Sequence, residues 1–203
     1  MLLTIIVPAY NEETRIEKAL DSVPRREDLE VLIVDDGSTD KTYEVCQKYA
    51  EEHSDLNIRI IRLEKNQGLG NAKNVGYENA HGDYINQLDA DDYLITEAYE
   101  HVMQELDGTD MVYMDLQIDN GSSWRVREET KHIWCGGPLR FIRREFLGDS
   151  RCPAIRAGED WFLNEELQKK PHTDKYTGIV GYHYSFPREG SLCDLRSRGL
   201  LDV

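Results

Sequence analysis

The sequence predicts one α/β domain in which a mostly parallel sheet is covered by helices. Apolar segments alternate with helical patterns along the first half of the chain, and the connections between them are short. The segments 2–7 and 29–34 are predominantly apolar, as expected for strands that are buried on both faces. A length of 203 residues is enough for one domain with a substantial core.

The first half of the chain is expected to contain four strands and three helices. The strands are predicted over 2–7, 29–34, 57–63 and 84–88, and the helices over 12–23, about 39–52 and 71–80. Asn11 is expected to cap the first helix, and Ser38 or Thr39 the second, because short polar side chains accept hydrogen bonds from the first backbone N–H groups of a helix.

The second half is expected to be less regular. Asn120-Gly121 is a strong hairpin signal after a strand over 110–119. Arg140, Arg143 and Arg144 are expected on the solvated face of a short basic helix, with contact to an acceptor or a phosphate as the alternative. The remaining expected elements are a helix over 95–106, this basic helix over 139–146, a helix over 158–169, a strand over 176–184 and a partly disordered tail over 187–203.

Charge and composition limit the classes of partner. The net charge of -15 argues against a nucleic-acid backbone or an anionic lipid surface as a major partner. No apolar run approaches the roughly 20 residues of a membrane-spanning helix, and residues 1–8 are too short for a signal peptide. The four cysteines are scattered, which favours free thiols and a cytoplasmic location.

Polar clusters follow three of the predicted parallel strands. They lie at residues 8–12, 35–40 and 89–92. Ligands bind at the carboxyl ends of strands in such sheets, where helix N-termini also converge. The three clusters are therefore expected to face one crevice at a single edge of the sheet.

The third cluster places three carboxylates, Asp89, Asp91 and Asp92, within four residues. Carboxylates this close repel one another, and each costs free energy to remove from water. A divalent cation would relieve the repulsion, because hard cations bind oxygen ligands and keep substrate phosphates in their remaining positions. The alternative is an acidic turn that caps the next helix.

The order of these motifs resembles family 2 glycosyltransferases. The resemblance rests on VPAYNE at 7–12, VDDGSTD at 34–40, NQG and AKNVG within 66–76, and LDADD at 88–92. It continues more loosely through 134–147, 158–161 and 188–192. The resemblance implies a GT-A fold and inverting transfer from a nucleotide-sugar donor with a divalent metal, Mn²⁺ or Mg²⁺.

The resemblance also implies roles for individual residues. Tyr10 would pack against a base, Asp36 would recognise the base or ribose while Asp35 secures the loop, and Lys73 would lie near the nucleotide. Arg188 would close over the diphosphate, since arginine binds phosphate bidentately. The implied nucleotide-sugar contacts are Pro8, Tyr10, Glu12, Asp36, Lys73, Asp89, Ala90 and Arg188.

Metal contacts are implied at Asp91, Asp92 and His183. Asp91 is the first choice, and Asp89 would lie nearer the ribose or a metal-bound water. Asp92 is either a second ligand or a helix cap, and His183 is either a metal or diphosphate contact or a structural histidine. The metal would act as a Lewis acid on the departing diphosphate.

Inversion needs a base that takes the proton of the acceptor hydroxyl. The resemblance implies Asp160, with Glu159 in reserve. The alternative for both is a pair of helix N-terminal carboxylates favoured by the helix dipole. Trp161 either packs in the core, which is the favoured interpretation, or stacks on a sugar face.

The expected protein is thus a metal-dependent inverting glycosyltransferase that uses a nucleoside-diphosphate sugar, with a UDP-sugar as the expected donor. The alternatives are a non-catalytic nucleotide-sugar-binding protein and a sugar nucleotidyltransferase. Residues 1–94 would form the donor half, 95–186 the acceptor half of the same domain, and 187–203 a flexible tail. The acceptor half is short, so acceptor recognition would be minimal, supplied by the partner subunit of a homo-oligomer, or built from the tail.

Overall fold

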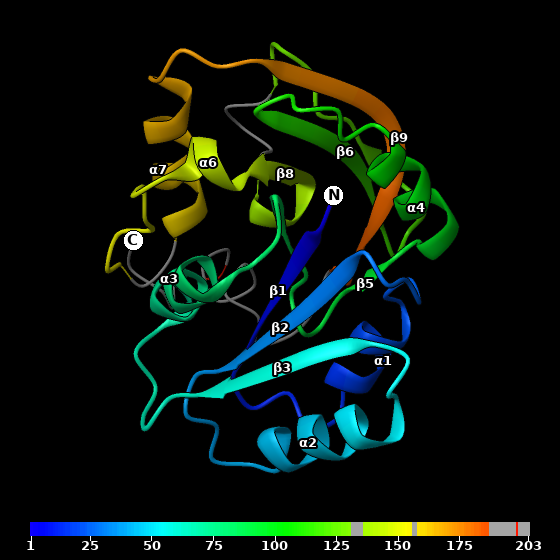
Figure 1. The fold of residues 1–203 in the computed structure, drawn as a ribbon, viewed down its shortest axis with the longest axis vertical. Helices are drawn as coiled ribbons and strands as arrows, with labels where there is room; N and C mark the ends of the chain where they lie inside the picture. The colour runs from blue at the N-terminus through cyan, green and yellow to red at the C-terminus, as the bar shows by residue number, and fades with distance from the viewer. Residues whose placement is uncertain (131–135, 156–157, 187–197, 199–203) are drawn as a thin grey trace.

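A single mixed sheet runs through the part of the chain that the structure, a computed structural model, describes: residues 1–130, 136–155, 158–186 and 198. The strand order is β3-β2-β1-β4-β8-β6-β9-β5, and β7 pairs with β6 outside this path. Helices flank the curved sheet (Figure 1).

The strands are β1 (Leu3–Ala9), β2 (Leu29–Asp35), β3 (Asn57–Arg62), β4 (Tyr84–Gln87), β5 (Tyr93–Leu94), β6 (Met111–Ile118), β7 (Ser123–Trp124), β8 (Arg140–Arg143) and β9 (Asp174–Tyr184). The helices are α1 (Ile16–Asp21), α2 (Thr42–Glu52), α3 (Leu69–Asn79), α4 (Thr96–Gln104), η1 (Gly137–Leu139), α6 (Arg144–Leu147) and α7 (Glu159–Gln168).

The first half has the predicted parallel arrangement. Strands β3, β2, β1 and β4 are parallel neighbours in that order. Every residue of β1 and β2 is buried, which explains why these segments show no alternation of apolar and polar residues. Helix α3 packs on β1 and β2, while α2 packs on β2 and β3.

The first two helices begin later than predicted, and the expected caps are wrong. Asn11 adopts a positive φ of 57° and lies outside α1. Its Oδ1 instead accepts a hydrogen bond from the Thr39 backbone N–H at 2.9 Å. Ser38 Oγ accepts one from the Asn11 N–H at 3.0 Å, so these polar side chains join two loops instead of capping helices.

The predicted basic helix over 139–146 is also wrong. Leu139 ends the 3-10 helix η1, Arg140–Arg143 forms strand β8, which pairs antiparallel with both β4 and β6, and the α-helix covers only Arg144–Leu147. Arg140 is 1% exposed, so it does not lie on a solvated face. Pairing with two neighbouring strands outweighs the local helical pattern, because strand formation depends strongly on tertiary context.

The rest of the second half extends the sheet. The hairpin at Asn120-Gly121 is confirmed, since β6 and β7 pair antiparallel with Leu116 opposite Trp124. Strand β9 pairs parallel with β6 and antiparallel with the short strand β5, which the sequence did not indicate. The predicted helix at 158–169 corresponds to α7.

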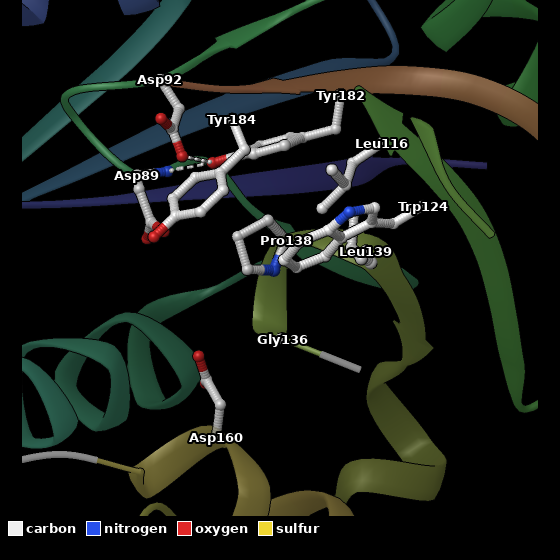
Figure 2. A pocket seen from close by; sticks show the side chains of 10 residues that line it. All are labelled: Asp89, Asp92, Leu116, Trp124, Gly136, Pro138, Leu139, Asp160, Tyr182 and Tyr184. Atoms are coloured by element: carbon white, nitrogen blue, oxygen red, sulfur yellow. Dashed lines mark hydrogen bonds between the residues drawn. The ribbon is translucent and has the colours of Figure 1, made fainter. Parts of the chain in front are cut away.

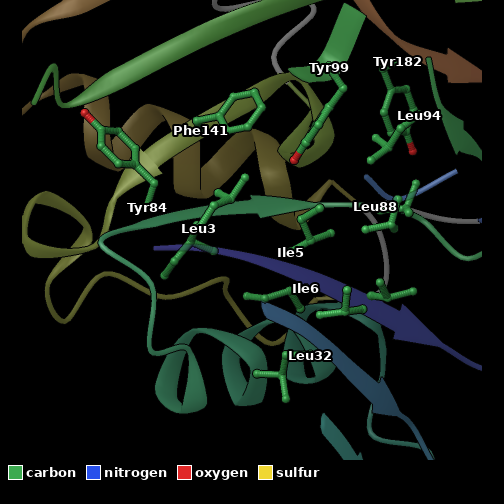
Figure 3. Close-up of a cluster of buried hydrophobic side chains, with 14 of the residues drawn as sticks. Leu3, Ile5, Ile6, Leu32, Tyr84, Leu88, Leu94, Tyr99, Phe141 and Tyr182 are labelled. Atoms are coloured by element: carbon green, nitrogen blue, oxygen red, sulfur yellow. The ribbon is translucent and has the colours of Figure 1, made fainter. Parts of the chain in front are cut away.

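One hydrophobic core joins both halves of the domain. Figure 3 shows Leu3 and Ile5 of β1 on the side of Tyr99 of α4 and Phe141 of β8, whereas Ile6 lies on the side of Leu32 of β2. Cys46 and Cys152 are buried free thiols, whereas Cys135, Cys193 and the predicted tail, apart from Arg198, lie outside the described residues. Across the described ranges, no helix combines the length and the apolar character needed to cross a membrane.

Candidate active site

The polar clusters after β1 and β2 meet at the expected edge of the sheet. The Asp36 N–H donates to the Ala9 carbonyl at 2.8 Å, and the Glu12 N–H donates to Thr42 Oγ1 at 2.7 Å. Pro8 is buried in β1 beside Val34, while Tyr10 is 42% exposed. The edge therefore combines a rigid backbone with one aromatic ring that a ligand can reach.

Asp36 organises the loop that precedes α3. Its two carboxylate oxygens accept hydrogen bonds from the Gln67 and Gly68 N–H groups, each at 2.8 Å. Burial raises the pKa of Asp36 and outweighs these two N–H groups, which lower it. Asp35 secures its own loop as expected, because its Oδ1 accepts from the Ser38 N–H at 3.1 Å.

Arg15 links the first cluster to the acidic loop after β4. Its Nε lies 2.5 Å from Glu12 Oε2. That hydrogen bond is the main cause of the raised pKa of Arg15, to which Asp91 and Asp40 also contribute. The guanidinium is thus surrounded by carboxylates from three loops. No motif in the sequence pointed to this residue.

A pocket of about 240 Å³ lies between the acidic loop and α7. In Figure 2, the carboxyl groups of Asp89 and Asp160 point into it from opposite ends. Aromatic and aliphatic side chains form the wall between them. The lining residues are Asp89, Asp92, Leu116, Trp124, Gly136, Pro138, Leu139, Asp160, Tyr182 and Tyr184.

Asp92 is fastened to the end of β9. Tyr182 Oη donates to Asp92 Oδ2 at 2.7 Å, and the Ser185 N–H donates to Oδ1 at 2.8 Å. Burial, followed by the nearby Asp91 carboxylate, raises the pKa of Asp92 to about 7. Each oxygen of Asp92 therefore already has a partner within the protein.

One carboxylate oxygen of Asp89 is available to bind a ligand. Its Oδ1 is buried and accepts no hydrogen bond from the residues that the structure describes. Burial raises the pKa of Asp89 well above its usual value, even though Lys73 acts in the opposite direction. Repulsion from Asp92 and Asp91 adds to the effect of burial. A cation beside Asp89 would offset both the cost of burying the charged carboxylate and its repulsion by Asp91 and Asp92.

The described residues contain no cluster of three metal-ligating side chains, His, Cys, Asp or Glu, at this edge. This suits an ion that is bound through one or two carboxylates and completes its shell with phosphate oxygens and water.

His183 lies away from the pocket. The side chains of a strand alternate between its two faces, and the neighbouring Tyr182 and Tyr184 both line the pocket. The His183 ring stacks on Tyr93 with centroids 4.1 Å apart, and the Lys18 ammonium lies 3.8 Å from the centroid of the same tyrosine. Burial lowers the pKa of His183 despite the nearby Asp119.

Lys73 joins the two carboxylates at the start of α7. Its Nζ lies 2.8 Å from Glu159 Oε1 and 2.6 Å from Asp160 Oδ2. Burial alone would raise the pKa of Asp160, but the positive charges of Lys73 and Arg140 lower it, and the net shift is downward. Asp160 is therefore held ionised beside the pocket.

The first turn of α7 places its two carboxylates and Trp161 in different surroundings. Asp160 lines the pocket, whereas the Glu159 side chain is 5% exposed and is not among the lining residues. Trp161 is 47% exposed, so the favoured interpretation of core packing is wrong. Arg188 falls outside the described residues.

Sequence reasoning missed several pocket residues. Trp124 lies on the short strand β7, and Tyr182 was overlooked beside His183, although period-two alternation in β9 could have separated the two. Gly137 is tightly enclosed, because a Cβ there would lie 3.0 Å from Asp160 Oδ1 and 1.6 Å from Gln87 Oε1.

Comparison with known proteins identifies the family. Residues 4–161 match the family model described as Glycosyl transferase family 2. The chain belongs to this family. The matched residues include both carboxylate ends of the pocket, Asp89 and Asp160.

Two curated relatives show how this glycosyltransferase compares in sequence. The poly(ribitol-phosphate) beta-N-acetylglucosaminyltransferase TarS of Staphylococcus aureus (strain Mu50 / ATCC 700699) is 32% identical over 94% of this chain and 36% of its own length. The uncharacterized glycosyltransferase EpsJ of Bacillus subtilis (strain 168) is 39% identical over 51% of this chain and 30% of its own length. The alignments thus span about a third of each relative.

Solved structures confirm the predicted GT-A type sheet. The crystal structure of S. aureus TarS 1-349 in complex with UDP-GlcNAc matches with a TM-score of 0.78 and 25% identity, over 94% of this chain and 60% of that one. The mannosyltransferase PcManGT from Pyrobaculum calidifontis, in complex with GDP-Man and Mn²⁺, matches with a TM-score of 0.74 and 23% identity, over 93% and 58%. The second likeness concerns the fold alone.

Proposed function

We propose that this glycosyltransferase moves a sugar from a nucleoside-diphosphate sugar to an acceptor hydroxyl with inversion, by a single displacement. The observation that carries this proposal is the pocket in which Asp89 and Asp160 face each other from opposite ends. One end suits a donor diphosphate with its metal, and the other end offers an ionised carboxylate to the incoming hydroxyl.

The donor would bind at the edge formed by β1, β2 and β4. Tyr10 is exposed there and supplies a face on which a base can stack. Asp36 holds the loop at Gln67 and Gly68 with both carboxylate oxygens, and it is the proposed contact to the base or ribose through the remaining acceptor capacity of these oxygens. Pro8, Glu12 and Ala90 complete the proposed contact set. A UDP-sugar is the proposed donor, supported by the likeness to TarS, whose structure contains UDP-GlcNAc.

The acidic loop fits a divalent cation, Mn²⁺ or Mg²⁺. Asp91 is the proposed main ligand, and the unpartnered Asp89 Oδ1 faces the same region. Asp92 would hold the loop in place, since its oxygens already accept from Tyr182 and Ser185. When bound, the ion supplies Lewis-acid stabilisation of the departing diphosphate. His183 is left out of this set because its ring lies on the other face of β9.

Asp160 is the proposed base. Its Oδ1 is buried in the pocket wall without a hydrogen-bond partner among the described residues. This oxygen would accept the proton of the acceptor hydroxyl as the hydroxyl oxygen bonds to the anomeric carbon and the nucleoside diphosphate departs. Glu159 is the poorer candidate, because its carboxylate is buried against Lys73.

The wall of the pocket fits the acceptor. Trp124, Tyr184 and Leu116 lie along it. Aromatic rings provide flat apolar surfaces that pack against the C–H face of a sugar ring, while hydroxyl groups reach the polar end of the pocket. We propose that the acceptor approaches Asp160 along this wall.

A donor screen tests the proposed function. Purified protein is incubated with UDP- and GDP-sugars in the presence of Mn²⁺, Mg²⁺ or a chelator, and release of the nucleoside diphosphate is measured. Release that depends on the metal supports the proposal. Binding of a nucleotide sugar without release or transfer would indicate a non-catalytic binding protein, and formation of pyrophosphate from a nucleoside triphosphate would indicate a nucleotidyltransferase.

Asp160→Asn tests the base separately. This change keeps the size of the side chain but removes its basicity, so transfer is expected to fall by roughly 10²–10⁴-fold. Donor affinity, measured by calorimetry with a UDP-sugar, is expected to stay within about twofold. Transfer at the wild-type rate would show that another group takes the proton.

A further inference from the structure

A buried ammonium group connects α3 to the proposed base. Lys73 is 1% exposed and lies between Glu159 and Asp160, whose side chains are 5% and 20% exposed. Gly70, one turn earlier on α3, permits this approach, because a Cβ there would lie 3.4 Å from Glu159 Cβ and 3.0 Å from the Pro153 carbonyl. The close contact between the two helices thus brings Lys73 to the first turn of α7.

We propose that Lys73 is a positioning residue that orients Asp160 for proton abstraction. The ammonium holds Asp160 Oδ2 at 2.6 Å. Oδ1 makes no hydrogen bond of ordinary length and angle in the described part of the chain, although the backbone N–H of Gly137 contributes to the lowered pKa of Asp160. One oxygen is therefore anchored while the other is left for the acceptor hydroxyl. This inference rests on the proposed function of Asp160 as the base.

Asp160 shares its ammonium partner with a second carboxylate. One ammonium serves two carboxylates, and Glu159 therefore competes with Asp160 for Lys73. Although burial opposes the ammonium, the neighbouring carboxylates hold the pKa of Lys73 well above its usual value, so it stays charged. The ionisable groups that influence Asp160 or respond to it are Lys73, Arg140, Glu159, Asp89, Tyr77 and Cys152.

A different role for Lys73 is direct contact with the nucleotide. Its burial and its two short contacts with Glu159 and Asp160 disfavour that role. The two roles predict different kinetics. A nucleotide contact acts on donor affinity, whereas a positioning residue acts on the chemical step and on its dependence on pH.

Three variants test the proposal. Lys73→Met removes the charge but keeps much of the packing, Lys73→Arg keeps the charge, and Glu159→Gln removes the competing carboxylate. The readouts are kcat at saturating donor, donor affinity by calorimetry, the acidic limb of the pH–rate profile, and the ¹³C-carboxyl NMR titration of Asp160, whose signal is assigned from its loss in Asp160→Asn.

Lys73→Met is expected to lower kcat by roughly 10–100-fold, because a misplaced catalytic group can cost about 10²-fold. The acidic limb and the Asp160 titration are expected to move to higher pH, by roughly 1–3 units, since a neighbouring positive charge is lost. Glu159→Gln is expected to move both to lower pH, and Lys73→Arg to restore part of kcat. Donor affinity is expected to change less than twofold in all three.

A loss of donor affinity in Lys73→Met, with kcat and the acidic limb unchanged, would overturn the proposal in favour of nucleotide contact. If Lys73→Met does not fold, Glu159→Gln tests the proposal. An Asp160 titration that is unchanged in Glu159→Gln would show that the Lys73 and Glu159 charges do not act on Asp160, and this would overturn the proposal. If the wild type transfers no sugar, the proposed function fails, and the NMR titration still shows whether Lys73 controls Asp160.

Discussion

The phenol of Tyr182 donates a 2.7 Å hydrogen bond to Asp92 Oδ2 and accepts a longer one, at 3.3 Å, from the Asp89 backbone N–H. Tyr182 belongs to β9, whereas Asp89 and Asp92 lie in the loop that follows β4. This single hydroxyl therefore joins the acidic loop after β4 to β9, the last described strand.

Tyr182→Phe is expected to lower both the free energy of unfolding and the activity measured over a Mn²⁺ titration. Asp92 would lose one of its two partners while remaining buried, which costs about 1–3 kcal/mol of stability. A loosened acidic loop should also lower kcat/KM by roughly tenfold, equivalent to about 1.4 kcal/mol. The measurements are thermal unfolding and a Mn²⁺ titration of activity.

Tyr84→Phe is the matched control for this prediction. The Tyr84 hydroxyl donates to the Thr109 carbonyl at 2.6 Å and accepts from the Gly108 N–H at 3.0 Å. It does not line the pocket. We expect this variant to lose stability without any change in the Mn²⁺ titration, and an equal change in both variants would argue against a special role for Tyr182.

Gly137→Ala is expected to lower activity strongly. The new Cβ would lie 1.6 Å from Gln87 Oε1 and 3.0 Å from Asp160 Oδ1, so Gln87 or η1 must move. Such a shift next to the base should lower kcat by about 10²-fold. Gly136→Ala is the control, since its nearest contact would be Pro138 Cδ at 3.7 Å. Steady-state kinetics of both variants check the prediction, and similar losses would contradict it.

Trp124→Ala is expected to weaken acceptor binding selectively. The indole lines the pocket wall, and its removal would leave a sugar ring without a stacking surface. Acceptor KM should rise by about tenfold while donor affinity stays unchanged. Trp161→Ala serves as the control, because Trp161 follows Asp160 but does not line the pocket. Equal effects of the two changes would remove the reason for placing the acceptor beside Trp124.

Glu30→Gln is expected to destabilise the fold at neutral pH but not in acid. Glu30 is 1% exposed, and its carboxylate accepts from Thr4 Oγ1 and Arg59 Nη1, each at 2.6 Å. Although burial would raise the pKa of Glu30, these partners and the His81 N–H lower it below the ordinary value of 4.5. The charged form thus stabilises the fold above that value, and this stabilisation is lost as pH falls through the lowered pKa.

Thermal unfolding between pH 3 and pH 8 checks this prediction. The difference between wild type and Glu30→Gln should be roughly 1.5–3 kcal/mol at pH 7, because hydrogen bonds to a charged group are lost while Arg59, whose side chain is 35% exposed, can be solvated. It should shrink steadily below about pH 4.5. A difference that is constant over the whole range would show that Glu30 acts through packing and not through its charge.

The sequence predicted the parts of this protein that local patterns encode. Apolar runs marked β1 and β2, and polar clusters marked the carboxyl ends of strands, of which the first two meet in the structure through Asn11 and Ser38. The order of motifs also indicated the family that the comparisons confirm. Hydrophobic periodicity and local composition are properties of short segments, so these features can be recognised in the sequence before the fold is known.

Only the tertiary structure decided which distant residues meet. Arg140 was expected in a solvated helix but lies in β8, because β8 as a whole pairs with β4 on one side and β6 on the other. Lys73 contacts the carboxylates of Glu159 and Asp160, which lie 86 and 87 positions later in the chain. Tyr182 donates a hydrogen bond to Asp92, which lies 90 positions earlier. No local pattern encodes such contacts, since they arise from the packing of α3 on α7 and the pairing of β9 with β5. The residue types of the candidate site are present in the sequence, but the fold determines which oxygen of Asp160 is held by Lys73.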